Sequence, residues 1–160
     1  MPSGRHKLGN ERRSDELPIL RVIEPNLAGP SGHYAEFVRA LAARSGGVFH
    51  SIEVVGAPGA ERFLSTLGGE VAVTAIAQPR GPFGELRAIR ASLAEGRRTL
   101  VLTATAAHAI LADRAAVVGR EGLGHLAMFV HWPLVKPAER LALLLAGRAH
   151  EDSLFIVPTR

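Results

Sequence analysis

Short apolar runs alternate with helical segments along almost the whole chain, and this alternation restricts the fold more than any other feature. Six runs are rich in β-branched and other apolar residues and are bounded mostly by glycine or proline. They cover residues 19–23, 48–55, 70–76, 99–103, 126–131 and 154–157, with helical patterns at 34–41, 60–67, 82–93, 107–118 and 137–145. Such alternation predicts a three-layer α/β/α sandwich, in which a mostly parallel, doubly wound sheet of about six strands carries helices on both faces.

The first of these units, residues 17–41, consists of a strand, a glycine-bearing loop and an amphipathic helix at 34–41. Gly29, Ser31 and Gly32 lie in the loop. Parallel sheets bind ligands at the carboxyl ends of their strands, so this loop is the first place to look for function. Its glycines and the helix N-terminus behind them suit a phosphate group. Alternatively, these residues only turn the chain, and Ser31 caps the helix.

Three of the seven histidines stand where a site at this edge of the sheet would be. His33 opens the first helix, His108 lies just beyond the fourth strand, and His131 ends the fifth, followed by Trp132. Imidazoles there could accept a hydroxyl proton or pair with phosphate, and the indole could stack on a sugar or base. Each of them could equally be a loop residue with an ordinary hydrogen-bonded or packing partner.

Several sharper signatures are absent from the sequence. There is no G-x-G-x-x-G, and the second strand ends in Val54-Val55 rather than in an acidic residue. There is also no G-K-[ST] loop, no G-x-S-x-G elbow, no H-E-x-x-H and no cysteine. We therefore expect no metal and no cofactor, and serine-triad hydrolysis is disfavoured.

Composition is that of a globular protein, with 47% hydrophobic and 21% charged residues and a net charge of +4. The highly charged residues 1–16 predict a flexible tail, and residues 17–160 a single domain.

The isoelectric point of about 10.6 arises because nearly all cations are arginine. These arginines are scattered along the chain, so we expect no nucleic-acid partner. No apolar run reaches the roughly 18–20 residues of a transmembrane segment, and the charged residues 1–16 lack the apolar core expected of a secretory signal. Together with the lack of cysteine, this favours a cytoplasmic protein.

The segment PILRVIEPNLAGPSGHYAEFVRALA resembles the opening of a two-Rossmann-domain (GT-B type) glycosyltransferase, which has a strand, a glycine loop before a histidine or aromatic residue, and a helix. LAMFVHWP resembles the fifth-strand segment of that family, and SLFIVPT its closing strand. The resemblance implies that residues 17–160 form the Rossmann-like acceptor-side domain. Sugar transfer from a nucleotide sugar would then need a second, donor-binding domain or subunit that this chain lacks.

In that role, His131 or His33 would orient or deprotonate a hydroxyl of the acceptor. The site for a sugar or sugar-phosphate acceptor would be lined by Gly29, Ser31, Gly32, His33, His108 and Trp132. Two other classes of function stay open: a non-catalytic binding or interaction module, and a stand-alone nucleotide- or phosphate-binding α/β protein. The leucine-rich residues 141–147 are apolar nearly all round, so the core or a partner covers them, and self-association into a homo-oligomer would supply one.

Overall fold

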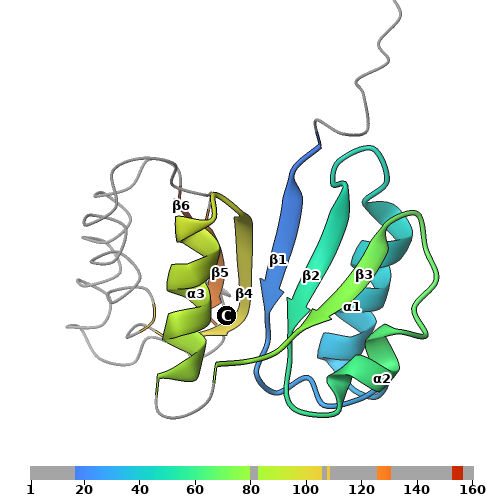
Figure 1. The fold of residues 1–160 in the computed structure, drawn as a ribbon, viewed down its shortest axis with the longest axis horizontal. Coiled ribbons are helices and arrows are strands. Elements are labelled where there is room, and N and C mark those ends of the chain that lie inside the picture. Colours follow the sequence, from blue (N-terminus) through green and yellow to red (C-terminus); the bar gives the residue numbers. More distant parts are fainter. Residues whose placement is uncertain (1–16, 80–82, 106–107, 109–125, 131–152, 157–160) are drawn as a thin grey trace, which may run out of the picture.

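The computed structural model describes residues 17–79, 83–105, 108, 126–130 and 153–156, and these residues form a six-stranded sheet with three helices (Figure 1). The tail predicted at 1–16 and nearly all of the helices predicted at 107–118 and 137–145 lie outside the described residues. The elements are β1 (Ile19–Ile23), α1 (His33–Arg44), β2 (Ser51–Val55), α2 (Ala60–Leu64), β3 (Ala72–Ile76), α3 (Gly84–Ala94), β4 (Arg98–Ala104), β5 (Leu126–Val130) and β6 (Ser153–Ile156).

The strands lie in the order β3-β2-β1-β4-β5-β6, and all five neighbouring pairs are parallel. The chain therefore builds one half of the sheet outward from β1, crosses back, and builds the other half outward from β4. Helices α1 and α2 lie on one face, and α3 lies on the other (Figure 1). The predicted fold class, a doubly wound α/β/α sandwich with a Rossmann-like sheet, is confirmed.

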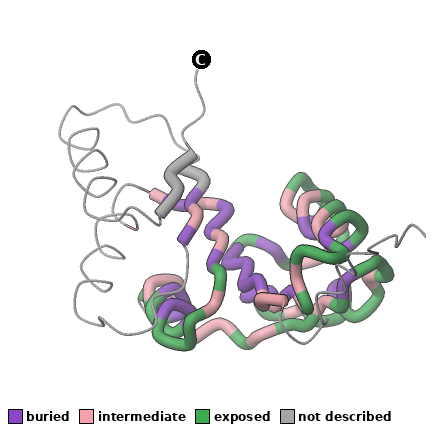
Figure 2. Tube along the Cα trace, turned by 90° about the horizontal axis from the view of Figure 1, so that it is seen from above, coloured by how far each residue is buried: buried purple, intermediate pink, exposed green. Residues whose placement is uncertain are grey.

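Side-chain alternation along the central strands produces two separate cores. In β1, Val22 packs with the cluster under α1 and α2, whereas its neighbour Ile23 packs with the cluster under α3. Both side chains are almost completely buried. This explains why β1 reads as a continuous apolar run, since a strand covered on both faces needs apolar residues at successive positions. Buried residues accordingly follow the strands, while the outer turns of the helices are exposed (Figure 2).

One polar network interrupts the α3 side of the sheet near the start of the strands. Arg21 of β1 pairs in register with Glu53 of β2 and donates hydrogen bonds to Glu53 and to Glu95, the residue that ends α3. The Nη2 atom of Arg21 lies 2.7 Å from Glu95 Oε2, and the Nε atom of Arg97 lies 3.5 Å from the same oxygen. Burial alone would lower the pKa of Arg21, but the hydrogen bonds to Glu95 and Glu53 outweigh it and raise the pKa. Two guanidinium groups and two carboxylates thus balance in charge.

The start of α3 differs from the sequence prediction. The helical pattern predicted at 82–93 would place Phe83 on the apolar face of the helix, but Phe83 precedes the helix and is 72% exposed. Its φ of 65° is in the left-handed region, which turns the chain into the helix and directs the ring outward. The buried face of α3 is instead formed by Gly84, Ala88, Ile89, Ser92 and Leu93.

Candidate functional site

The carboxyl edge of the sheet, where the parallel strands end, has its switch point between β1 and β4. Glu24 follows β1 immediately and is fully buried there. Its Oε1 accepts the backbone N–H of Asn26 at 2.9 Å, and its Oε2 accepts the hydroxyl of Thr103, near the end of β4, at 2.6 Å. The carboxylate therefore links the two strands across the switch point and is held in one orientation.

A second carboxyl and an imidazole lie at the same edge. His108 Nδ1 accepts the backbone N–H of Thr105 at 3.1 Å, which places the ring proton on Nε2. Nε2 is 3.4 Å from Oε2 of Glu85, a residue in the first turn of α3. The side chains of His108 and Glu85 are 22% and 17% exposed, so the pair is largely enclosed but reachable from solvent. The other oxygen, Glu85 Oε1, is buried and has no hydrogen-bond partner among the described residues.

Burial determines how these groups titrate. It raises the pKa of Glu85 to about 7, with the charge of Glu24 acting in the same direction. It also lowers the pKa of His108, so the imidazole is neutral near pH 7. The pKa of Tyr34, in the first turn of α1, is raised by burial and then by Glu24. A carboxyl that is half protonated at neutral pH is suited to give or take a proton, because its pKa matches the working pH.

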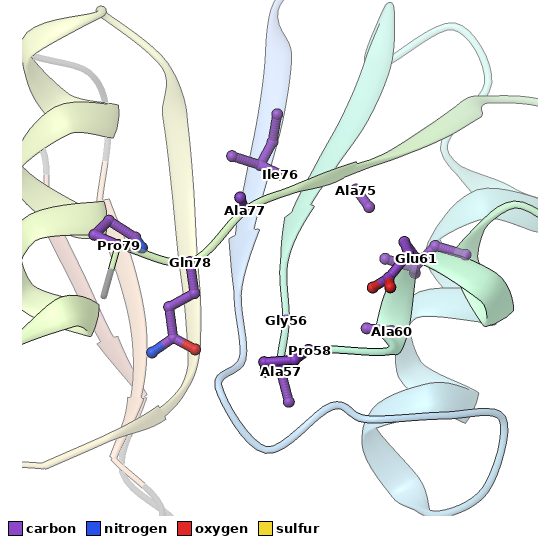
Figure 3. Close-up of a pocket in the computed structure, with 11 residues that line it drawn as sticks. Gly56, Ala57, Pro58, Ala60, Glu61, Ala75, Ile76, Ala77, Gln78 and Pro79 are labelled. Carbon is purple, nitrogen blue, oxygen red and sulfur yellow. The ribbon is translucent and has the colours of Figure 1, made fainter. Parts of the chain in front are cut away.

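A pocket of about 630 Å³ opens at the same edge of the sheet, beyond the carboxyl ends of β2 and β3. This volume is in the range of small-molecule sites. The walls come from the loop before α2, from α2 itself and from the segment after β3 (Figure 3). Most of the lining is apolar or glycine, and its polar side chains are Glu61 and Gln78. The loop after β1 packs against the same wall, since Ala57 donates its N–H to the carbonyl of Leu27 at 2.9 Å.

The residues predicted from the sequence lie at this edge where the structure describes them. Gly29, Ser31 and Gly32 form the loop between β1 and α1, and Gly32 has a φ of 91°. Ser31 does not cap the helix: Gly32 is the N-cap, and no side chain bonds there.

The predicted histidines have different outcomes. His33 is the first residue of α1 and is exposed, and its ring centroid lies 3.8 Å from the ring centroid of Tyr34. His108 lies at the switch point beside Glu85, while His131 and Trp132 lie outside the described residues. The structure therefore describes two of the three histidines of the predicted rim, and the catalytic role of His33 stays a prediction.

Sequence reasoning missed the carboxyls of the site. Glu24 carries a weak signal, because an acidic residue directly after a buried strand points to the carboxyl edge. Glu85 carries none, since a glutamate in the first turn of a helix is ordinary and its partner His108 is distant in sequence. Glu61, in the pocket wall, belongs to α2, whereas an acidic residue was sought only at the end of β2 itself.

The strand order and the site at the switch point define a doubly wound, Rossmann-like α/β protein. Among solved structures, the chain is similar to MrsD from Bacillus sp. HIL-Y85/54728, with a TM-score of 0.50 and 13% identity over 90% of this chain and 85% of that one. At this identity the likeness concerns the fold alone. No protein-family model and no curated protein matches the sequence.

These comparisons correct the resemblance drawn from sequence motifs. The matching structure is MrsD and not a GT-B glycosyltransferase, and no comparison supports sugar transfer from a nucleotide sugar. The interpretation of the chain as the acceptor-side domain of such an enzyme is wrong. The strand, glycine loop and helix on which it rested are common to Rossmann-like folds generally and do not identify one family.

Two further properties of the described residues bear on the site. They contain no group of three or more His, Cys, Asp or Glu side chains placed to hold a metal ion. None of the helices in these ranges has the length and apolar character that crossing a bilayer requires.

Proposed function

We propose that the chain is a stand-alone nucleotide-binding α/β protein that holds its ligand at the carboxyl edge, in the pocket beyond β2 and β3. The observation that carries the proposal is the position of this pocket of about 630 Å³ in a sheet of order β3-β2-β1-β4-β5-β6. Folds of this order bind nucleotides at the carboxyl ends of the strands beside the switch point. A cytoplasmic location, binding of a sugar-phosphate and self-association stay predictions.

The chemistry of the pocket suits the base and ribose of a nucleotide. Leu64, Ile76 and Pro58 provide apolar surface for a planar base. The carboxylate of Glu61 and the amide of Gln78 can bind hydroxyls or the edge of a base. A carboxylate repels phosphate, so the phosphate end of the ligand would point away from Glu61.

The glycine loop between β1 and α1 is the nearest suitable place for that phosphate. It adjoins the pocket, because a Cβ on Gly56 of the pocket wall would lie 2.9 Å from the carbonyl of Leu27. Gly29 and Gly32 have open space where a side chain would stand, which allows a ligand to approach the backbone. Behind them α1 begins without a side-chain cap, so its first N–H groups face the loop region with a partial positive charge.

Isothermal titration calorimetry with adenosine, guanosine and flavin mononucleotides tests the proposal, with the matching nucleosides and inorganic phosphate as separate ligands. We expect at least one nucleotide to bind with a Kd well below about 1 mM, and more tightly than its nucleoside or phosphate. Failure of every nucleotide to bind at this level contradicts the proposal. If inorganic phosphate binds as tightly as the nucleotide, the pocket contributes nothing to binding, and this result would also contradict the proposal.

Two matched substitutions on β3 locate the ligand. Ala75 is exposed and lines the pocket, whereas Ala72 is exposed at the opposite end of the same strand. Ala75→Phe should fill part of the pocket and weaken nucleotide binding at least about tenfold, or about 1.4 kcal/mol. Ala72→Phe adds the same ring outside the pocket and should leave the Kd unchanged. Equal affinities of the two folded variants would place the ligand elsewhere.

A further inference from the structure

The carboxyl group of Glu85 has two oxygens in different environments. Oε2 faces the Nε2–H of His108 at 3.4 Å, and Oε1 has no hydrogen-bond partner among the described residues although it is buried. An unpaired buried oxygen costs free energy, and such groups in native proteins call for a specific explanation. The group also lies at the start of α3, at the carboxyl edge of the sheet, where ligands of this fold bind (Figure 1).

We propose that Glu85 is a general acid at the switch point, which donates a proton from its partly exposed carboxyl group to a neutral ligand, and that His108 is its positioning residue. This gives the chain a catalytic activity beyond nucleotide binding. The proposal stands on the Glu85–His108 geometry and does not depend on which ligand occupies the neighbouring pocket.

The surrounding groups support an acid rather than a permanently ionised carboxylate. Glu24 approaches from the end of β1 and adds negative charge, while His108 approaches from beyond β4 as a neutral ring. Burial and Glu24 both favour the protonated form of Glu85, whose pKa is raised to about 7. Glu24 itself is fully buried and already accepts two hydrogen bonds, which hold its carboxyl group in place.

The transfer step is balanced without another reactant. The O–H bond of the Glu85 carboxyl breaks, and its electron pair stays on the carboxylate. A lone pair on an oxygen or nitrogen of the ligand forms the new bond to hydrogen, so one positive charge appears on the ligand and one negative charge on Glu85. The Nε2–H of His108 lies 3.4 Å from Oε2, close enough to stabilise the carboxylate electrostatically as it forms.

The charge of the site defines the class of substrate. Two carboxyl groups disfavour an anionic group at the reacting atom, whereas a developing positive charge is stabilised by Glu24. The substrate is therefore neutral where it reacts and carries a basic atom, such as a carbonyl oxygen, an imine nitrogen or the leaving oxygen of an ester or acetal.

A neutral aryl diazoacetamide is a direct probe of this property. A protonated carboxyl transfers its proton to the diazo carbon, and the resulting carboxylate displaces N₂ to form an ester, which mass spectrometry locates in the sequence. At pH 7 a carboxyl of pKa about 7 is half protonated, about 150 times more than one of pKa 4.5. Because Glu85 is partly enclosed, we expect its labelling at pH 7 to exceed that of the exposed carboxylates by at least about tenfold.

Variants of His108 separate positioning from space filling. His108→Phe keeps a buried ring but removes the N–H that stabilises ionised Glu85, so the pH at which labelling falls by half should move upward. His108→Gln restores an N–H donor and should return this midpoint toward that of the unmodified chain. If both variants keep the original midpoint, His108 only fills space, and its positioning role is overturned.

The labelling is carried out without nucleotide, so it is independent of the calorimetric result. Glu85→Gln, which preserves shape, should remove the ester from this position and identify the labelled residue. Labelling of Glu85 no faster than that of the exposed carboxylates at pH 7 overturns the general-acid assignment, whether or not a nucleotide binds. Fast labelling in a chain that binds no nucleotide supports the acid and rejects only the proposed ligand.

Discussion

Replacing Glu85 by glutamine should change how the stability of the protein depends on pH. Glu85 has a pKa of about 7 when folded and 4.5 as an ordinary carboxyl, so the folded state binds more protons between these values. Its contribution to stability is therefore fully present below about pH 4.5 and is lost as the pH rises through about 7. Glutamine does not titrate, so the variant should not show this loss.

The size of the effect follows from the same two values. A rise from 4.5 to about 7 corresponds to at most about 3 kcal/mol by proton linkage. Because 17% of the side chain is exposed and water screens it, we expect about 1–2 kcal/mol. Relative to the unmodified chain, Glu85→Gln should thus gain about 1–2 kcal/mol in the free energy of unfolding between pH 5 and pH 8.

Urea unfolding followed by circular dichroism at pH 5, 6, 7 and 8 measures this difference. The pKa of His108 is lowered by burial, so its contribution has the opposite sign and is lost as the pH falls. Both proteins contain His108, and its titration largely cancels in the difference between them. Glu85→Ala is the control for packing. It should be less stable than Glu85→Gln at every pH, but between pH 5 and pH 8 it should show the same gain relative to the unmodified chain. A difference that stays flat from pH 5 to pH 8 would refute the burial argument.

Variants at two further places, the Arg21 network and Phe83, test the structural account by urea unfolding. Arg21→Met leaves Glu53, which is only 15% exposed, without its main partner, and it should lower the free energy of unfolding by about 3 kcal/mol or more. The double variant Arg21→Met with Glu53→Leu should recover most of this loss. A loss below about 1 kcal/mol in Arg21→Met would contradict the network. Phe83→Gly should stabilise the chain by about 0.5–1 kcal/mol, because it relieves a left-handed φ of 65° and exposes no core. Phe83→Ala keeps the strain and should give no such gain, and a loss with glycine would show that the ring packs against something.

The fold could be predicted because each local pattern agreed with one architecture. The continuous apolar run of β1 and the helical stripe of α1 indicated a strand buried on both faces and a helix packed on one of them. Phe83 was misplaced because its position in the helical stripe does not reveal a left-handed residue before the helix. The pairing of β1 with β4 was not predicted either, because the sequence does not show on which side of β1 each later strand is added.

The site could be predicted only in part, because its residues meet through tertiary structure. His108 was identified by its position after a strand, which is a local property. Glu85 acquires its raised pKa from burial and from the charge of Glu24, and neither is visible in the residues next to it. The glycosyltransferase resemblance failed for a related reason: its motifs describe the strand and loop of a widespread fold, whereas activity depends on the side chains gathered around that loop.

The two ends of α3 place carboxylates in opposite electrostatic surroundings, and this contrast separates structural from functional charge in the protein. At the C-terminal end, Glu95 meets Arg21, and the hydrogen bond lowers the pKa of the carboxyl. At the N-terminal end, the helix dipole should also favour an ionised Glu85, yet burial and Glu24 outweigh it and raise the pKa. An apolar residue at this position would remove the free-energy cost of burying an ionisable carboxyl group, so stability alone does not account for a glutamate there. The carboxyl edge, and not the charge-balanced network around Arg21, is therefore where the chemistry of this chain should be sought.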